Sequence, residues 1–469
     1  MDELFSESNI NKIAKASGFV KRQRKLSPLL YLDLLFHSAS SGNCSLEMLS
    51  VEASKEHHLP VSKQGIDYRF TDKSICFSKS VLSKAIENRV HTGVLSESKD
   101  LFNRILIKDS TRFEIAPSFA SFFPGHGGSS SKAGVSIQFE YDLKNGQISD
   151  IDLQPSLCRD STDALAKQEL IQAGDLIIRD LGYYHSLSFE NIMDKNAYFI
   201  SRLHSSCNVY VQKEGNKKMD FGFIYKQMQS AREQYRDLNV YIGKERLPVR
   251  LIIAPVPEEV YEKRIRERNN KNKHKPKSKS RSKDEVKRLA WDNHVQGKGE
   301  KGYNMSDEFR KRARLNLFIC NIPTEDLDCD SIYGLYKTRW QIELYFKVWK
   351  SIVNINSIRK MKYERFVTML YVHLLWIVIN WEIIFPLRTY LYENQEKLLS
   401  VYKCMNTLKT YSRIIRSLLR LTCKRAGKML REIYSLLSNR HWLERRKGGT
   451  SYMDLYPLLF CKSENYIYI

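Results

Sequence analysis

One segment, residues 330–352, restricts the fold more than any other part of this chain. Its sequence, DSIYGLYKTRWQIELYFKVWKSI, lacks proline and has few β-branched residues, so we expect a helix. At 100° per residue, Glu343, Lys350 and Arg339 fall about 20°, 40° and 60° from Tyr336. The rest of the circumference is mostly apolar, which is typical of a buried helix. A surface helix with charged pairs four residues apart is the alternative, but it would have a broad polar face. We therefore expect this one polar stripe to face a cleft.

Two aspartates each follow an apolar strand pattern. RILIKDST at 104–111 is a β-branched run, and DLIIRD at 175–180 is a second, shorter one. Asp109 and Asp180 lie where these runs stop, and the carboxyl ends of core strands border the crevice where α/β folds bind ligands. Aspartate is also a common turn residue, so each one alone is weak evidence. Two of them, on strands that the pattern makes neighbours, indicate a shared site.

The pattern around these strands predicts a mixed α/β core. Residues 135–143 alternate between apolar and polar, Asn-Gly at 145–146 supplies a turn, and 149–153 returns as the second strand of a hairpin. Helices and further short strands follow along the chain. We place the first part of the core at residues 99–204 and the last part, with the catalytic helix, at residues 326–365.

Residues 205–325 interrupt this core and are expected to form a β-rich insertion. VRLIIAPV at 249–256 and LNLFICNI at 315–322 read as strands. Between them, residues 263–288 are basic and nearly free of apolar side chains, so a mobile loop is predicted. This loop is either a solvated linker or an arm that contacts the DNA backbone.

The first 98 residues are expected to form a helical DNA-binding domain. Four basic residues precede its long apolar helix: Lys21, Arg22, Arg24 and Lys25. Two later helices, with a break at Leu59-Pro60 and Ser62 as an N-cap, suit a helix-turn-helix or an ordinary bundle equally well.

Residues 366–469 are expected to form a helical C-terminal region. Their apolar run, FVTMLYVHLLWIVI at 366–379, is short for a membrane span, and Asn380 and Glu382 follow it. A buried core helix is therefore expected, and His373 within it is expected to be a core histidine and not a ligand.

The charge of the chain points to nucleic acid. The formal net charge is +23, and basic residues recur along the whole length, as a long phosphate track requires. The nine cysteines form no CxxC pair, so a zinc site or disulfide framework is not expected. The N-terminus, MDELFSESNI, does not have the pattern of a signal peptide, and an intracellular, reduced setting follows.

These residue types suit phosphodiester chemistry. Two Mg²⁺ ions about 4 Å apart can activate an attacking oxygen and stabilise a leaving one. Mg²⁺ prefers carboxylate oxygens, which Asp109, Asp180 and Glu343 would supply. Arg339 and Lys350 beside Glu343 would position phosphate oxygens without competing for the metal.

Tyr336, Arg339, Glu343 and Lys350 have the spacing Y-x2-R-x3-E-x6-K, in YKTRWQIELYFKVWK. This spacing resembles the signature of a group of bacterial insertion-sequence DDE transposases. KDST and RDLGYY are similar to the contexts of that group's first and second aspartates. GFVKRQRKLSP and VSKQGIDYRF also resemble its leading domain. The resemblance therefore covers most of the chain.

The resemblance implies an RNase H-like catalytic core with a β-rich insertion before Glu343. Asp180 and Glu343 are 163 positions apart, too far for one connection, so a subdomain must lie between them. The implied activity is cut-and-paste transposition with Mg²⁺ or Mn²⁺, in which a freed 3′-hydroxyl makes a hairpin that is opened before strand transfer. The implied partners are DNA with terminal inverted repeats, target DNA and a second copy of the chain in the synaptic complex, in the bacterial cytoplasm at the nucleoid.

Relatives flip a base near the transposon end onto an aromatic side chain, and Trp291 is the candidate here. His185 is expected to serve packing or hydrogen bonding and not the metals. Two other functions fit the composition: a DNA-binding regulator that no longer cuts, and a stand-alone nuclease of the same fold.

Overall fold

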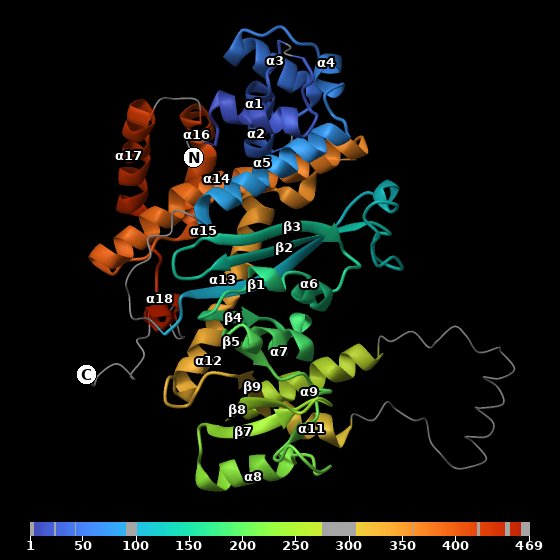
Figure 1. Ribbon diagram of the computed structural model, residues 1–469, viewed down its shortest axis with the longest axis vertical. Coiled ribbons are helices and arrows are strands. Elements are labelled where there is room, and N and C mark those ends of the chain that lie inside the picture. Colours follow the sequence, from blue (N-terminus) through green and yellow to red (C-terminus); the bar gives the residue numbers. More distant parts are fainter. Residues whose placement is uncertain are drawn as a thin grey trace, which may run out of the picture. The chain divides into compact units, whose positions relative to one another are not determined.

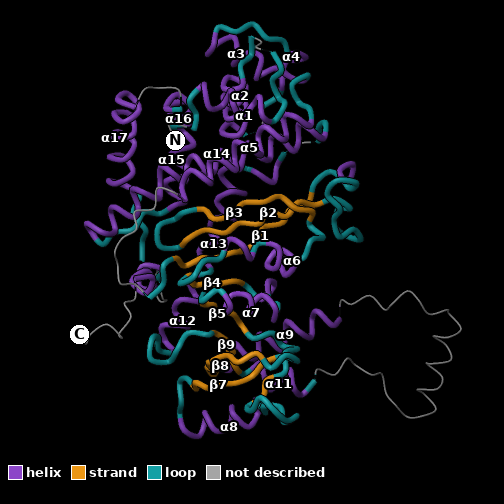
Figure 2. Tube along the Cα trace, viewed as in Figure 1, coloured by secondary structure: helices purple, strands orange, loops and turns teal. Residues whose placement is uncertain are grey.

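The structure, a computed structural model, describes residues 4–22, 25–42, 44–90, 101–273, 306–358, 360–419, 423–445 and 451–460. Its contacts divide the chain into two units. The first combines Met1–Ala197 with Gly334–Ile469, and the second is Tyr198–Tyr333. Figure 1 follows the chain by colour and Figure 2 by secondary structure.

The first unit contains four strands in the order β3-β2-β1-β4. Strands β1, β2 and β3 are antiparallel neighbours, and β4 runs parallel to β1. This arrangement confirms the predicted hairpin and the predicted neighbouring strands. The bounds are β1 Arg104–Glu114, β2 Gly134–Asp142, β3 Ile148–Pro155 and β4 Asp175–Arg179. A parallel pair needs a crossover, which α6 (Asp160–Ala166) and a 3-10 turn supply.

Aromatic side chains cover one face of this sheet. Phe139 of β2 contacts Trp349 and Trp381, with ring centroids 4.7 and 5.5 Å away. Trp349 directly follows α13 (Trp340–Val348), and Trp381 lies on α14 (Tyr363–Gln395). Period-2 alternation sends the neighbours of Phe139 to the other face, where they meet α6.

Helix α14 is the central core helix. It is 33 residues long and apolar enough to cross a membrane, yet 94% of its most apolar window is buried inside the protein. The prediction of a core helix is confirmed. His373 is fully buried, and its Nδ1 donates to the Met369 carbonyl oxygen at 2.7 Å. Burial lowers the pKa of His373 to about 4, so it is a neutral core histidine, as expected.

The N-terminal helices pack onto α14. Helices α2 and α5 lie against it, and α5 runs alongside it in Figure 1. Helices α3 and α4 form the predicted pair, and the Ser62 side chain caps α4 as expected. The bounds are α1 Glu7–Ala16, α2 Pro28–Ser41, α3 Leu46–His57, α4 Lys63–Asp67 and α5 Asp72–Val90.

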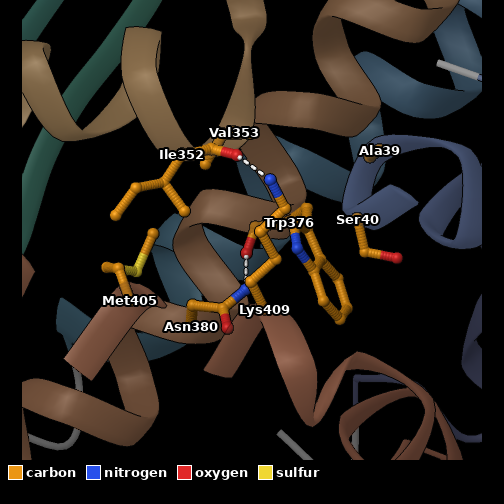
Figure 3. Close-up of a pocket in the computed structure, with 8 residues that line it drawn as sticks. All are labelled: Ala39, Ser40, Ile352, Val353, Trp376, Asn380, Met405 and Lys409. Carbon is orange, nitrogen blue, oxygen red and sulfur yellow. Dashed lines mark hydrogen bonds between the residues drawn. The ribbon is translucent and has the colours of Figure 1, made fainter. Parts of the chain in front are cut away.

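Four C-terminal helices complete the first unit: α15 Val401–Thr410, α16 Ser412–Leu418, α17 Cys423–Arg440 and α18 Tyr452–Leu455. Figure 3 shows a small pocket lined by residues of α2, α14 and α15 and by Ile352 and Val353. Lys409 donates to the Ile352 carbonyl oxygen (3.1 Å) and Asn380 to that of Trp376 (2.7 Å). None of the residues that line this pocket belongs to the predicted site.

The second unit contains antiparallel strands in the order β5-β9-β8-β7-β6. The β-rich character predicted for this region is therefore present. The strands are β5 Tyr198–Arg202, β6 Val209–Tyr210, β7 Arg236–Ile242, β8 Leu247–Pro255 and β9 Leu315–Cys320. The helices are α8 Phe221–Ala231, α9 Glu258–Lys273 and α11 Asp307–Ala313. Strand β5 falls within the residues that we assign to the first part of the core, and it pairs with β9 of the predicted insertion.

The predicted basic loop, residues 263–288, is wrong for its first part, because 263–273 belong to α9. Arg264 supplies the physical reason. Its guanidinium donates to the carbonyl oxygens of Ala313 (2.9 Å) and Leu315 (3.0 Å), so a basic side chain holds the helix in place. Composition alone does not reveal such an anchor. Residues 274–288 and Trp291 lie outside the described residues.

We predict that Gly146→Ala destabilises the hairpin turn. Gly146 has φ +75°, and an added Cβ would lie 2.0 Å from the Phe385 ring. Strain and overpacking together should lower the free energy of unfolding by about 2–5 kcal/mol. Gly427→Ala, in α17 with open space around it, is the control and should stabilise by about 0.5–1 kcal/mol. Equal effects in urea unfolding would contradict the assigned role of the turn.

A second prediction concerns Asp142, which is fully buried. Burial raises its pKa to about 6, although the N–H groups of Ile105 and Lys144 lower it. A carboxyl with a raised pKa stabilises the fold only at low pH, and this contribution is lost as pH rises through 6. As the pH rises from 4.5 to 7.5, the free energy of unfolding of the Asp142→Asn variant should therefore increase by about 2 kcal/mol relative to that of the unmutated protein. Chemical unfolding at both pH values measures this, and a pH-independent difference would refute it.

Candidate active site

The parallel pairing of β1 and β4 brings Asp109 and Asp180 together. Lys108 is paired with Arg179 in the register, and the two aspartates are the next residues on their strands. Asp109 accepts the Ser110 N–H at 2.8 Å, and Asp180 begins the turn that follows β4. The expected neighbouring strands therefore bring the two aspartates together. The expectation that Asp109 ends its strand is wrong, because β1 continues to Glu114 through its pairing with β2; Asp109 lies where the pairing with β4 ends.

Arg339 connects this edge to Glu343. Its Nη1 lies 3.0 Å from Asp109 Oδ2, and its Nη2 lies 2.8 Å from Glu343 Oε1. The side chains of Arg339 and Asp109 are 15% and 17% exposed, while that of Glu343 is 37% exposed. Glu343 on α13 is thus the most accessible of the three groups. A single guanidinium holds the helix and the strand together.

The helix predicted for residues 330–352 is not continuous. It consists of α12 (Cys329–Thr338), α13 and a π-helical turn over Trp349–Val353. Around Arg339 the bonds span three residues, from Arg339 N to Tyr336 O and from Ile342 N to Arg339 O, both 3.2 Å. Arg339 keeps helical dihedral angles, so its side chain and that of Glu343 still lie on one side.

The carboxylates interact electrostatically. Burial raises the pKa of Asp109 to about 6, the Ser110 N–H and Arg339 lower it, and the charges of Asp180 and Glu343 raise it. Burial lowers the pKa of Arg339, but interactions with Asp180, Tyr336 and Asp109 raise it by more, so the pKa is higher than usual. Three acidic groups therefore share the field of one buried cation.

Lys350 and Tyr336 complete the polar stripe. Lys350 Nζ donates to the Arg112 carbonyl oxygen at 3.1 Å, near the end of β1 and three residues beyond Asp109. Burial lowers the pKa of Lys350. The Arg339 guanidinium carbon lies 6.0 Å from the centroid of the Tyr336 ring. The stripe therefore faces the carboxyl end of β1.

The remaining candidates lie elsewhere. Lys21, Arg22 and Lys25 are exposed between α1 and α2, and Arg24 lies outside the described residues. His185 is half-buried at the start of α7 (Ser186–Asp194).

The donor chemistry of the site suits a divalent metal. Three carboxylates offer hard oxygen atoms, and the mutual repulsion of their charges is relieved by a cation. In the described part of the chain, no three acidic, histidine or cysteine side chains are already arranged as a metal-binding cluster. The guanidinium of Arg339 lies between Asp109 and Glu343 and offsets part of their negative charge.

Sequence reasoning missed the charges behind the site. Lys108 and Arg179, each directly before a predicted catalytic aspartate, are buried at 0% and 6% exposure. They pair with acidic residues of other elements, including Asp150 and Glu140. A lysine inside the apolar run ILIK and an arginine closing LIIR were the available signals.

Comparison with known proteins matches these findings. The family described as "Transposase DDE domain" matches residues 100–379. The transposase for insertion sequence element IS231E from Bacillus thuringiensis subsp. finitimus is 27% identical, over 97% of this chain and 93% of its own. The transposase for IS1151 from Clostridium perfringens is 28% identical, over 87% and 85%.

A solved structure, the piggyBac transposase synaptic complex with hairpin DNA, is 11% identical with a TM-score of 0.43, covering 96% of this chain and 85% of that one. The assignment rests on the domain match, which spans more than half of the chain, and on the relatives. The α/β class and the RNase H-like core are confirmed with it. The chain belongs to the DDE transposases and is a DNA transposase of the bacterial insertion-sequence kind.

Proposed function

We propose that Asp109, Asp180 and Glu343 are the catalytic carboxylates and that they hold two divalent ions, Mg²⁺ or Mn²⁺. Membership of the DDE family implies divalent metal use. The observation that carries the assignment is the Arg339 bridge between Asp109 and Glu343, with Asp180 within electrostatic reach. When bound, the ions activate the attacking oxygen and stabilise the leaving oxygen.

The cationic residues of the stripe bind the DNA backbone. Arg339 is the counter-ion of the carboxylates in the metal-free chain, and its planar guanidinium suits a phosphate once divalent ions neutralise them. Lys350 offers a compact charge near the end of β1, where it donates to the backbone carbonyl oxygen of Arg112. Tyr336 adds a hydroxyl donor.

The exposed cations of the N-terminal region bind the transposon ends. Three of these cations are exposed between helices α1 and α2: Lys21, Arg22 and Lys25. They can contact phosphate groups without breaking any buried interaction. Arg24 belongs to the same cluster by sequence. The substrate is DNA with terminal inverted repeats, which two copies of the chain hold in a synaptic complex, in the cytoplasm at the nucleoid.

The reaction follows the cut-and-paste order that the resemblance implies. Water attacks one strand at the transposon end, and the freed 3′-hydroxyl attacks the opposite strand to make a hairpin. The hairpin is opened, and the 3′-hydroxyl then joins target DNA. In each step an oxygen of water or of a 3′-hydroxyl forms a P–O bond while one P–O bond of the attacked phosphodiester breaks, so one set of carboxylates serves every step.

Asp109→Asn, Asp180→Asn and Glu343→Gln test the assignment. Each should reduce Mg²⁺-dependent cleavage of an end fragment by about 10³-fold or more, since the residues act as a unit. Binding of the same fragment should stay within about threefold, because phosphate contacts supply most of the affinity. The exposed Glu190→Gln is the control. Near-normal cutting by any one variant removes that residue from the site. Cleaved ends without joined product would identify a nuclease instead.

Arg339→Gln tests the shared-cation geometry without an activity assay. Loss of the bridge should lower the unfolding free energy of the metal-free protein by about 1–2 kcal/mol at pH 8. Mn²⁺ should then raise Tm more in the variant than in the unmutated protein, because no internal cation competes. Arg104→Gln, which breaks the ion pair with Asp175 at the far end of β1, should lower Tm without changing the Mn²⁺ response. Equal Mn²⁺ responses in all three proteins would be evidence against the proposal.

A further inference from the structure

A row of charged residues crosses the four strands of the first unit, directly behind the carboxylates. The register pairs Asp150 of β3 with Glu140 of β2, Glu140 with Lys108 of β1, and Lys108 with Arg179 of β4. All four are buried, with exposures of 7%, 1%, 0% and 6%. An apolar sheet face would be the ordinary outcome at such depth, so this row requires an explanation.

The row is held by ion pairs that span the strands. Arg179 Nη2 reaches over β1 to Glu140 Oε2 on β2 at 3.0 Å. Lys108 Nζ lies 2.9 Å from Asp150 Oδ2 and 2.6 Å from Asp163 Oδ2 of α6. The two pairs between strands each span an intervening strand, β4 to β2 and β1 to β3, and the third joins β1 to the crossover helix.

The charges of this cluster balance. Lys167, after α6, adds a third cation, 3.2 Å from Asp150 Oδ1. Three cations thus face three carboxylates, and the cluster carries no net charge toward the metal site. Its members are Lys108, Glu140, Asp150, Asp163, Lys167 and Arg179.

The position of the row relates it to the site. Lys108 and Arg179 each precede a proposed catalytic aspartate by one residue, and strand alternation puts the row on the face opposite Asp109 and Asp180. The two aspartates repel each other across the β1–β4 pair. Something must hold their strand ends side by side against that repulsion.

Stability alone does not account for the row. Apolar residues of similar volume often replace buried ion pairs at no cost in stability. In the described structure, Arg179 Nε and Nη1 are buried without hydrogen-bond partners, which is a further cost. A slip of one residue in β1 or β4, however, would exchange the aspartates with Lys108 and Arg179 between the two faces. A slip of β1 would break the ion pairs of Lys108 with Asp150 and Asp163, and a slip of β4 would break that of Arg179 with Glu140, so the row makes either slip unfavourable.

We propose that Lys108 and Arg179 are positioning residues: the buried row sets the register and spacing of Asp109 and Asp180 and so determines how tightly the site binds metal. This inference rests on the proposed assignment of the two aspartates as metal ligands. The positioning residues touch neither metal nor DNA. They act through the strands that carry the ligands.

The test compares two double variants of the full chain. Glu140→Gln/Arg179→Gln removes one ion pair of the row and leaves no unpaired charge from it. Arg104→Gln/Asp175→Asn is the matched control, because this pair joins β1 and β4, the two strands that lead into Asp109 and Asp180, at their amino ends, with bonds of 2.8 and 2.6 Å. For each protein, the Mn²⁺ concentration for half-maximal end cleavage is measured. Mn²⁺ binding to the protein–DNA complex is measured by electron paramagnetic resonance, and Tm by circular dichroism.

The Glu140→Gln/Arg179→Gln variant should need at least about 10-fold more Mn²⁺ for cleavage and for binding, because loss of groups that orient metal ligands typically weakens metal binding by this much. Saturating Mn²⁺ should restore most of its cleavage rate. The control should lower Tm with less than about a twofold shift in Mn²⁺ requirement, since it lies away from the ligands. A row variant with an unshifted requirement, or a control shifted equally, overturns the inference.

Arg179→Lys keeps the buried charge and covers the case in which the double variant fails to fold. Its shorter reach to Glu140 should give a shift of about two- to fivefold in Mn²⁺ requirement, and no shift would overturn the inference. Asp109→Asn, assayed in parallel, separates the two proposals. If it cleaves normally, the ligand assignment is wrong and the inference fails with it. If it is inactive while the row variants show normal metal dependence, the inference alone fails.

Discussion

The parallel pairing of β1 with β4 is the constraint on which the site depends. It sets Lys108 against Arg179 and therefore Asp109 beside Asp180. Two carboxylates so placed repel each other, and burial adds to the cost, as the raised pKa of Asp109 shows. The remaining structure around this edge either offsets that cost or holds the strands in place against it.

Packing supplies the third carboxylate. Glu343 is far from β1 and β4 in the sequence, so tertiary contacts must fix the position of its helix. Phe139, the residue opposite Asp109 on β2, packs against Trp349 just beyond α13 and against Trp381 of α14. The aromatic core is thus on the same sheet face as the site, and close-packed rings leave the helix little freedom to shift.

Charge is arranged differently on the two faces of the sheet. On the face that carries Asp109, acidic groups surround the guanidinium of Arg339, which suits a site that takes up cations. On the opposite face, the row with Lys108 and Arg179 forms a cluster of ion pairs without net charge. A surplus of negative charge at an active site commonly costs stability. In this sheet the acidic groups lie next to Lys108 and Arg179, whose ion pairs link the strands on the opposite face.

Local pattern was sufficient for the elements that carry the candidate site residues. Strand alternation and the Asn-Gly turn predicted the hairpin, and helical periodicity put Arg339 beside Glu343, because both patterns depend on residues close in sequence. The family match and the relatives agree with the function that these motifs predicted. The α14 core helix was also predictable from its composition.

Tertiary structure alone decided which charges are buried and paired. Lys108 reaches Asp150 across 42 positions, and Arg339 reaches Asp109 across 230, so no local window contains both partners. The anchoring of α9 by Arg264 is of the same kind, because Arg264 and Ala313 are 49 positions apart. The sequence by itself therefore determined the residue types of the candidate site and the elements that carry them. The tertiary structure decided which charged groups lie beside these residues, because an ion pair depends on proximity in space and not on spacing along the chain.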